Sequence, residues 1–286
     1  MKVIALLLAA RPITLIATAV PVLLGTKLGS ENFSNFNLVI FCCCLLSALC
    51  IQIATNYFND AIDYIKGADR PERQGPKRMV ATGMLSYKNM QLAAYSMILA
   101  ATLFAIPLLI NCGWPIIAIG LPSLYCTYAY TGRPLELAYR GLGELFVIIF
   151  FGLIAVTGSA FTQSGNFMPG ALILGLQSGL LATSLIALNN LRDRAQDALA
   201  NKRTLAVRLG EKFAKLEVSF CLIAPFLIEE LINHALFSSL ALQLTSLVAL
   251  LCAVLTWCKP SKGQSKYLLT MAALTYLLFG ISKLSL

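Results

Sequence analysis

Long apolar segments, separated by short polar stretches, run along almost the whole chain. Nine of them reach or approach the roughly 20 residues that a helix needs to cross a bilayer. They cover residues 13–28, 37–58, 89–111, 114–130, 142–162, 170–190, 213–232, 235–257 and 267–281. Only Cys112 and Gly113 separate the third segment from the fourth, so a tight helical hairpin is expected there. The pattern predicts an all-α, polytopic membrane protein with nine transmembrane helices in a bundle around a central cavity.

The composition agrees with this prediction. The 286 residues are 58% hydrophobic and only 12% charged, and the mean hydropathy is +0.77. Soluble domains carry about 25% charged residues. The apolar run at residues 3–10 is expected to continue past Arg11 and Pro12 into the first span, rather than to act as a signal peptide.

Lys and Arg are segregated along the chain. All of them except Lys27 and Lys283 fall in the N-terminal segment or in every second loop. Because positive charge accumulates in cytoplasmic loops, we expect a cytoplasmic N-terminus and an outer C-terminus. Topology and anionic lipid headgroups then account for the net charge of +9, and no nucleic-acid partner is expected. The start at Met1, without a transit peptide, favours a bacterial inner membrane.

Other polar and sulfur-containing residues indicate little chemistry. The nine cysteines form no CxxC pair and the only histidine is His234, so a Cys/His metal site is not expected. Most cysteines are interpreted as small packing residues. Glu229 and Glu230, at the outer end of the seventh span, are expected to be solvated.

Two cytoplasmic loops, about residues 56–88 and 189–212, hold most of the unusual polar residues. If the second helix continues into the first loop, four side chains share one of its faces at i, i+3, i+4 and i+7: Asn56, Asn59, Asp60 and Asp63. In the second loop, Asn189, Asp193 and Asp197 share a face at i, i+4 and i+8.

The two clusters are four spans apart and share an Asn-xxx-Asp spacing. This repetition suggests two four-helix halves plus one extra helix, in a single domain over residues 1–286, with both clusters facing a shared cavity. Ionisable groups at membrane depth are costly and usually functional. Carboxylates flanked by Lys and Arg suit Mg²⁺ bound with a diphosphate. If the diphosphate carries an allylic isoprenoid, an aromatic-lined cavity can stabilise the resulting cation.

Two motifs, Asn59-xxx-Asp63 and Asp193-xxx-Asp197, resemble the signatures of the UbiA-type prenyltransferase superfamily. The first loop is similar to the 1,4-dihydroxy-2-naphthoate prenyltransferase branch of the menaquinone pathway. The residues that carry this likeness are Asn59, Asp60, Asp63, Lys66, Gly67, Asp69, Arg73 and residues 75–78. Segments 11–14, 130–134, 139–144, 189–193 and 202–210 extend it, and it weakens after Gly210.

Three positions depart from the family pattern. Gly67 stands where the superfamily often has a third Asp. The naphthoate branch also has Gly at this position, with an Asp two residues later, as Asp69 is here. A Tyr-xxx-Lys element that some relatives have is absent, because the fourth residue after Tyr125 is Ala129. Arg133 is expected to supply the positive charge of the missing Lys. Asn201 stands where the branch usually has Gly.

The resemblance implies a fold of nine transmembrane helices, Mg²⁺ as cofactor, and transfer of a polyprenyl group to dihydroxynaphthoate with loss of CO₂. The implied metal ligands are Asn59, Asp60, Asp63, Asp193 and Asp197. The implied catalytic residues are Asp63, Asp69, Asp193, Lys202 and Arg203. Residues expected to bind the diphosphate or the acceptor are Asn56, Lys77, Arg78, Tyr130, Arg133, Asn189, Asn190 and Arg192.

Two other interpretations stay open at this point. A 4-hydroxybenzoate or other aromatic-acceptor prenyltransferase differs only in the branch residues. A secondary transporter would also have repeated halves, but it predicts acidic residues or broken helices near the bilayer midplane. The expected partners are polyprenyl diphosphate, an aromatic small molecule and membrane lipids, with no obligate protein partner. The prenyl chain length is not legible in the sequence.

Overall fold

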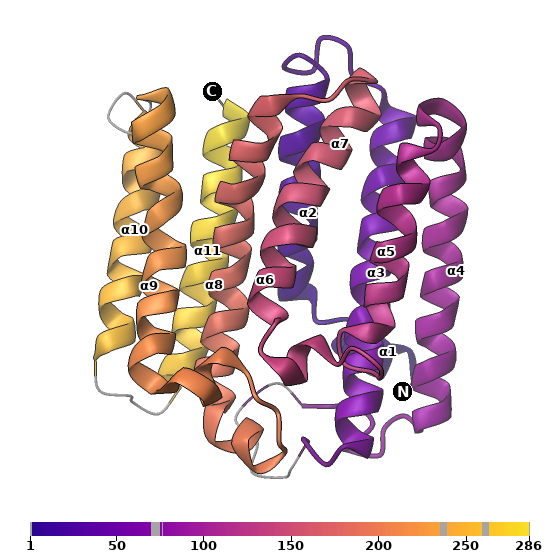
Figure 1. The fold of residues 1–286 in the computed structure, drawn as a ribbon, viewed down its shortest axis with the longest axis vertical. Helices are drawn as coiled ribbons and strands as arrows, with labels where there is room; N and C mark the ends of the chain where they lie inside the picture. The colour runs from indigo at the N-terminus through magenta and orange to yellow at the C-terminus, as the bar shows by residue number, and fades with distance from the viewer. Residues whose placement is uncertain (1, 70–74, 76, 235–238, 259–262, 286) are drawn as a thin grey trace.

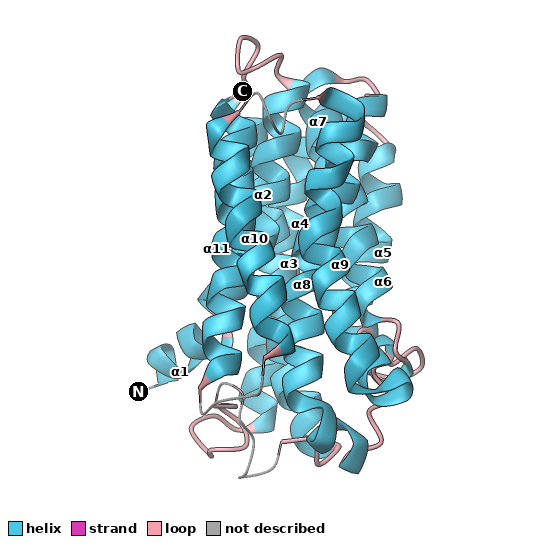
Figure 2. Cartoon of the chain, turned by 90° about the vertical axis from the view of Figure 1, so that its left-hand side faces the viewer, coloured by secondary structure: helices cyan, strands magenta, loops and turns pink. Residues whose placement is uncertain are grey.

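The computed structural model describes residues 2–69, 75, 77–234, 239–258 and 263–285. These residues form a helical bundle, and none of them is in a strand (Figure 2). The N-terminus lies near the lower end of the bundle and the C-terminus at its upper end (Figure 1).

The helices follow the predicted segments closely. In chain order they are α1 (Lys2–Ala9), α2 (Pro12–Gly29), α3 (Leu38–Ile65), α4 (Tyr87–Cys112), α5 (Pro115–Ala129), the short helix η1 (Leu137–Arg140), α6 (Gly143–Val147), the wider turn η2 (Ile148–Ile154), α7 (Ala155–Ser164), α8 (Pro169–Leu199), α9 (Leu205–Asn233), α10 (Leu240–Trp257) and α11 (Gln264–Ser285). The segments α6, η2 and α7 follow one another without a break and correspond to the predicted span 142–162.

Seven of these elements are long and apolar enough to cross a membrane: α2, α3, α4, the α6–η2–α7 segment, α8, α10 and α11. The other two predicted spans coincide with α5 and α9. Helix α5 is apolar but has only 15 residues, whereas α9 has 29 residues and a non-helical kink at Gly210. The protein is therefore an all-α integral membrane protein.

Local signals set several helix ends. Asn37, Ser86 and Thr204 precede α3, α4 and α9, and each side chain accepts a hydrogen bond from a backbone N–H of the first turn. Pro12, with the other prolines that begin α5 and α8, occupies the first turn of its helix, where the missing N–H costs nothing.

The apolar run at residues 3–10 does lead into the first span, but a break in the helix separates the two. Helix α1 ends at Ala9, and Arg11 adopts a left-handed conformation with φ of 53°. Pro12 then restarts the helix. Helix α1 consequently extends sideways from the lower end of the bundle (Figure 2), and the Tyr57 hydroxyl holds it by donating to the Leu6 carbonyl oxygen at 3.1 Å.

Small residues let the central helices approach closely. A Cβ atom on Gly25 of α2 would lie 2.2 Å from the Val156 carbonyl oxygen of α7. A Cβ atom on Gly152 of η2 would lie 2.4 Å from the Gly175 carbonyl oxygen and 2.6 Å from the Gly179 Cα of α8. In membranes, where the hydrophobic effect does not drive helices together, such close packing is a main source of association energy. These contacts hold the walls around the central cavity.

We expect Gly25→Ala to destabilise the protein by about 1–3 kcal/mol, since the added methyl group must push two backbones apart. The measurement is thermal unfolding in detergent. The control is Gly120→Ala, where nothing lies within 4 Å of the new Cβ. Equal melting temperatures for the two variants would contradict the close packing of α2 on α7.

The expectation that Glu229 is solvated is wrong. Glu229 is fully buried, and its carboxylate forms an ion pair with Lys283 at 2.8 Å. A buried charge is tolerated when it is paired and hydrogen-bonded. Helices α9 and α11 are therefore joined by a polar contact near the upper end of the bundle.

Candidate functional site

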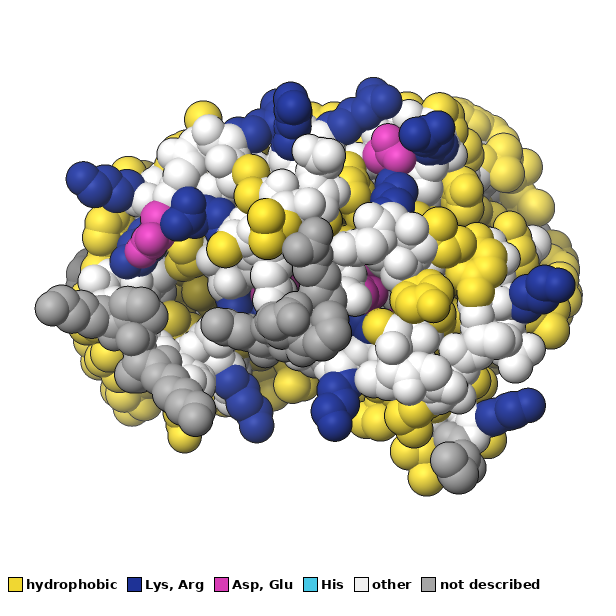
Figure 3. Space-filling model, turned by 90° about the horizontal axis from the view of Figure 1, so that it is seen from below, with side chains coloured by type: hydrophobic (Ala, Val, Ile, Leu, Met, Phe, Trp, Pro, Cys, Tyr) yellow, Lys and Arg dark blue, Asp and Glu magenta, His cyan; other side chains and the backbone are white. Residues whose placement is uncertain are grey.

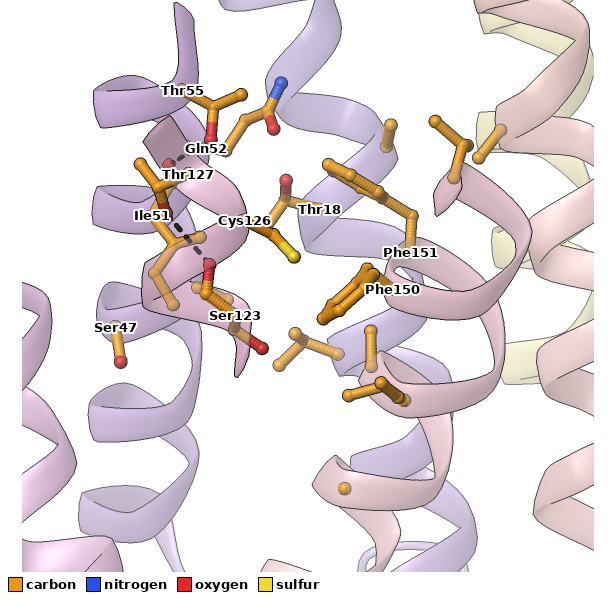
Figure 4. A pocket seen from close by; sticks show the side chains of 18 of the residues that line it. Thr18, Ser47, Ile51, Gln52, Thr55, Ser123, Cys126, Thr127, Phe150 and Phe151 are labelled. Carbon is orange, nitrogen blue, oxygen red and sulfur yellow. Dashed lines mark hydrogen bonds between the residues drawn. The ribbon is translucent and has the colours of Figure 1, made fainter. Parts of the chain in front are cut away.

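A cavity of about 310 Å³ lies inside the bundle, between α2, α3, α5, the α6–η2–α7 segment and α8. Most of its wall is apolar, with Phe146, Phe150 and Phe151 on one side. Figure 4 shows Phe150 and Phe151 across the cavity from side chains of α3 and α5 such as Cys126. The cavity can thus hold an extended apolar chain.

One end of this cavity is polar. Its lining there includes Arg11 at the start of α2, Asn56 and Asn59 of α3, Tyr130 at the end of α5 and Asn189 of α8. These residues come from the helix ends that carry the two sequence motifs. The apolar cavity therefore leads to the motif residues.

The first motif lies on α3, which continues past Asn56 as predicted and ends at Ile65. Asn56, Asp60 and Asp63 are all buried, which confirms that they share an inward face. The Asn56 amide donates to the Ala10 carbonyl oxygen at 2.8 Å. Asn59 forms a hydrogen bond with the Thr131 hydroxyl.

Asp60 fixes the loop that follows α3. Its Oδ2 accepts from the Met79 backbone N–H and its Oδ1 from the Val80 backbone N–H, both at 2.9 Å. These bonds bring residues 78–80 against the motif. Asp60 thereby positions Arg78 at the site.

Asp63 is the best-connected carboxylate of the site. Its Oδ2 lies 3.0 Å from Arg78 Nη2 and its Oδ1 accepts from the Tyr139 hydroxyl at 2.9 Å. Lys202 Nζ lies 4.0 Å from Oδ2. Arg78 also contacts Asp69 at 3.3 Å. Asp63 is thus surrounded by groups from three separate chain segments.

The second motif lies on the last turns of α8, where Asp193 and Asp197 are both buried. Arg192 holds Asp193 with two hydrogen bonds of 2.7 and 2.8 Å. Asn190 donates to Glu144 at 2.7 Å. The predicted helical face is therefore present on α8 as well.

Lys202 joins the two motifs. Its ammonium group lies 3.8 Å from Asp197 Oδ1 and 4.0 Å from Asp63 Oδ2. One ammonium group thus bridges carboxylates of α3 and α8, more than 130 positions apart in the sequence. The two acidic clusters do face one another, as the spacing predicted.

Tyr139 was not among the predicted site residues, although segment 139–144 carried part of the family likeness. Lys66 Nζ lies 3.8 Å from the centre of the Tyr139 ring, and Lys202 Nζ lies 5.6 Å from it. Lys66 also pairs with Glu136 at 2.6 Å. The segment between α5 and α6 therefore forms one wall of the motif end.

The electrostatic environment keeps the two residues of this wall in defined protonation states. The hydrogen bond from Lys66 holds the pKa of Glu136 below its usual range. Burial, together with the nearby Asp63 carboxylate, raises the pKa of Tyr139. Tyr139 therefore stays protonated and donates to Asp63 throughout the physiological pH range.

Three predicted residues do not join this cluster through their side chains. Lys77 and Arg203 are exposed, and Arg133, whose side chain is 88% exposed, lies 3.7 Å from Glu136. Arg203 reaches this wall through its backbone N–H, which donates to the Tyr139 carbonyl oxygen at 3.0 Å. Arg73 and Pro76 lie outside the described residues.

The motif end of the molecule is predominantly basic at its surface. Figure 3 shows Lys and Arg side chains spread over this face, with few acidic side chains among them. The motif carboxylates are buried beneath the surface. A basic rim around buried carboxylates attracts an anion that arrives with its own cations.

The oxygen donors fit Mg²⁺ held together with a substrate. Within the part of the chain that the structure describes, no three His, Cys, Asp or Glu residues form a complete metal site. Mg²⁺, however, is usually bound by one or two carboxylates, with substrate phosphates and water completing its shell. Asp63 and Asp197, which share Lys202, supply such a pair.

Solved structures with this fold include a UbiA homolog from Aeropyrum pernix, with a TM-score of 0.73 and 17% identity over 94% of this chain and 96% of that one. A UbiA homolog from Archaeoglobus fulgidus bound to GPP and Mg²⁺ gives a TM-score of 0.65 and 14% identity over 99% of this chain and all of that one. At these identities the likeness establishes the fold.

Sequence relatives are more similar. The 1,4-dihydroxy-2-naphthoate octaprenyltransferase of Haemophilus influenzae is 34% identical over 70% of this chain and 68% of its own length. The Escherichia coli protein of the same name is 32% identical over 72% of this chain and 68% of its own length. The UbiA prenyltransferase family matches residues 18–279. This chain therefore belongs to the UbiA prenyltransferase family.

Proposed function

We propose that this protein transfers a polyprenyl group from an allylic polyprenyl diphosphate to 1,4-dihydroxy-2-naphthoate. The carboxylate of the acceptor is lost as CO₂, and the other products are pyrophosphate and the hydroquinone form of demethylmenaquinone. One observation carries the proposal: Lys202 joins the motif carboxylates Asp63 and Asp197 next to the polar end of an apolar cavity. The relatives named as dihydroxynaphthoate octaprenyltransferases support the choice of acceptor.

The residues divide the substrate into two parts. Arg78, Arg192 and Lys202 neutralise the diphosphate oxygens, for which guanidinium and ammonium groups are suited. Asp63 and Asp197, with Asn59 nearby, would hold Mg²⁺, which would supply positive charge to stabilise the leaving pyrophosphate. The prenyl chain lies in the cavity, where the rings of Phe146, Phe150 and Phe151 face the developing allylic cation.

Prenyl transfer then exchanges one bond for another. The C1–oxygen bond of the diphosphate breaks, and its electron pair leaves with pyrophosphate. The electron-rich ring carbon that bears the carboxylate forms the new bond to C1. The carbon–carboxylate bond breaks, and its electrons restore the aromatic ring as CO₂ departs. Asp193 and Asp69, each held by a neighbouring Arg, keep the site's cations in place.

The test compares acceptors with purified protein in detergent. We expect prenylated product and pyrophosphate with dihydroxynaphthoate, with little product from 4-hydroxybenzoate and none after Mg²⁺ is removed by EDTA. Adding Mg²⁺ back should restore turnover. If product formed with 4-hydroxybenzoate but not with dihydroxynaphthoate, the naphthoate acceptor would be wrong and prenyl transfer would still be supported. Turnover that survives EDTA would contradict the role of the metal.

We expect Tyr139→Phe to lower kcat/KM by about 10-fold, because it removes one hydrogen bond to a charged group near the diphosphate. The proton of Tyr139 is held throughout the physiological range, since its pKa is raised. The ratio of wild-type to variant activity should therefore be constant between pH 6 and pH 9. A ratio that falls steadily across this range would contradict Tyr139 as the protonated donor.

We also propose that residues 1–286 form a single domain in a bacterial inner membrane, with the motif end in the cytoplasm. The distribution of Lys and Arg supports this orientation. Labelling of single cysteines in intact cells tests it. A cysteine at Lys88 should react with an impermeant thiol reagent only after permeabilisation, and one at Asn32 should react before it. The opposite pattern would reverse the orientation.

A further inference from the structure

A second cavity, of about 300 Å³, lies at the end of the bundle opposite the two motifs. The last turns of α2, α9 and α11 and the first turns of α8 surround it, and its lining includes Lys27, Gln177, Asn233 and Lys283. The proposed prenyl transfer uses none of these residues. The cavity therefore needs an explanation of its own.

A buried polar network lies directly beside this cavity. Glu229 is fully buried, and both of its carboxylate oxygens lie 2.8 Å from Lys283 Nζ. The Gln177 and Asn233 amides donate to the same carboxylate at 2.9 and 3.0 Å. Glu229 is therefore matched in charge by Lys283 and saturated with hydrogen bonds, as a buried carboxylate must be.

Lys27 adds a second ammonium group to the same wall. It donates to the Lys283 backbone carbonyl oxygen at 2.9 Å and forms no ion pair within the described part of the chain. Two ammonium groups therefore line the cavity beside one carboxylate, which leaves one net positive charge. The two ammonium groups repel each other, and this repulsion is stronger at a partly buried site than in bulk water. An anion bound between them would relieve it.

These are also the two basic residues that depart from the segregation of charge along the chain. A lysine on this side opposes the usual distribution of positive charge in membrane proteins. Topology thus does not explain Lys27 and Lys283. The ion pair with Glu229 accounts for Lys283, whereas binding an anion accounts for Lys27.

The form of the cavity indicates where the anion comes from. Asn32, Gly170 and Asn233 are exposed and mark its opening, whereas Gln177 is buried. Leu174 and Ile173 add apolar wall beside the polar end. A cavity that is open to the membrane surface, apolar along its side and positively charged inside is suited to an anionic group with an apolar attachment.

We propose that this cavity binds a phosphate-bearing anion, either the headgroup of an anionic phospholipid or free phosphate, between Lys27 and Lys283. Lysine binds phosphate as a point charge, so the two lysines can bind the anion without a further hydrogen-bond donor. The Asn233 amide also lines the cavity. Binding would tie the ends of α2 and α11 together, far from the reaction.

The test measures binding by native mass spectrometry of the full chain in detergent. The probes are dihexanoylphosphatidylglycerol, dihexanoylphosphatidylcholine and inorganic phosphate. We expect one phosphatidylglycerol per protein, bound at least 10-fold more weakly by Lys27→Gln and equally well by Lys88→Gln, a matched loss of charge at the motif end. Glu229→Gln removes the competing carboxylate, so it should bind the anionic lipid more tightly than the wild type.

The competition experiment identifies the source of the phosphate. Displacement of phosphatidylglycerol by millimolar inorganic phosphate supports free phosphate as a ligand, and resistance to it supports the lipid headgroup. Three results would each overturn the proposal: binding of neither phosphatidylglycerol nor inorganic phosphate, equal affinity in the wild type and Lys27→Gln, or equally tight binding of phosphatidylcholine. Prenyl transfer by Lys27→Gln should equal that of the wild type, so this test is independent of the proposed reaction.

Discussion

Replacing Asp63 by Asn is expected to lower kcat/KM for prenyl transfer by roughly 10³-fold, and Asp197→Asn should have a similar effect. Each change keeps the size of the side chain but removes one of the two carboxylates that Lys202 bridges. Mg²⁺ and diphosphate would then lose a charged ligand at the point where the leaving group forms. The measurement is pyrophosphate release at saturating Mg²⁺.

The control for both variants is Glu211→Gln. Glu211 is an acidic residue in ion pairs with Lys215 and Arg194, and its side chain is 48% exposed. It should keep wild-type activity. Thermal unfolding of all three variants separates lost chemistry from lost folding, because Asp63 also pairs with the buried Arg78. A folded Asp63→Asn protein within threefold of wild-type activity would remove Asp63 from the proposed metal site.

Lys202→Gln is expected to lower kcat/KM by about 10²-fold, mainly through a higher KM for the polyprenyl diphosphate. Lys202 is the one group that contacts carboxylates of both motifs among the ion pairs of the described residues. Without it, the site would lose a cation that neutralises the diphosphate. Steady-state kinetics with the diphosphate varied at fixed acceptor concentration measures the effect.

Lys215→Gln is the matched control for this substitution. Lys215 pairs with Glu211 at 2.9 Å on α9 and with no motif carboxylate among the ion pairs of the described residues, so its loss should leave the kinetics unchanged. An unchanged KM for the diphosphate in Lys202→Gln, together with a normal KM for the acceptor, would show that Lys202 only holds the two helices together.

Helical periodicity explains why so much of the motif end was predictable. Asn56, Asp60 and Asp63 share a face because α3 is regular to Ile65, and the spacing of Asp193 and Asp197 reports the same for α8. The even number of spans between the two motifs places them at the same end of the bundle. Their meeting at Lys202 follows from these two facts.

The wall around Tyr139 could not be predicted in this way. It lies in the segment between α5 and α6, where turns rather than a repeating helix direct the side chains. The pairing of Lys66 with Glu136 spans 70 positions, and no local pattern indicates it. Asp60 is a similar case: its position on the helical face was predicted, but its bonds to Met79 and Val80 depend on how the next loop folds.

Glu229 shows the limit of hydropathy at helix ends. An acidic residue at the end of an apolar segment is normally solvated, yet Glu229 is buried because Lys283 reaches it from another helix 54 positions away. The signal that could have indicated this was Lys283 itself, which lies on the side of the membrane where few basic residues occur.

The most direct test of the account uses dihydroxynaphthoate labelled with ¹³C at its carboxylate, together with an allylic polyprenyl diphosphate, Mg²⁺ and purified protein. The account predicts that ¹³CO₂, pyrophosphate and unlabelled prenylated product form in equal amounts, and that all three form roughly 10³-fold more slowly with Asp63→Asn. Product that retains the label, or ¹³CO₂ released without pyrophosphate, would contradict prenyl transfer at the carboxylate-bearing carbon.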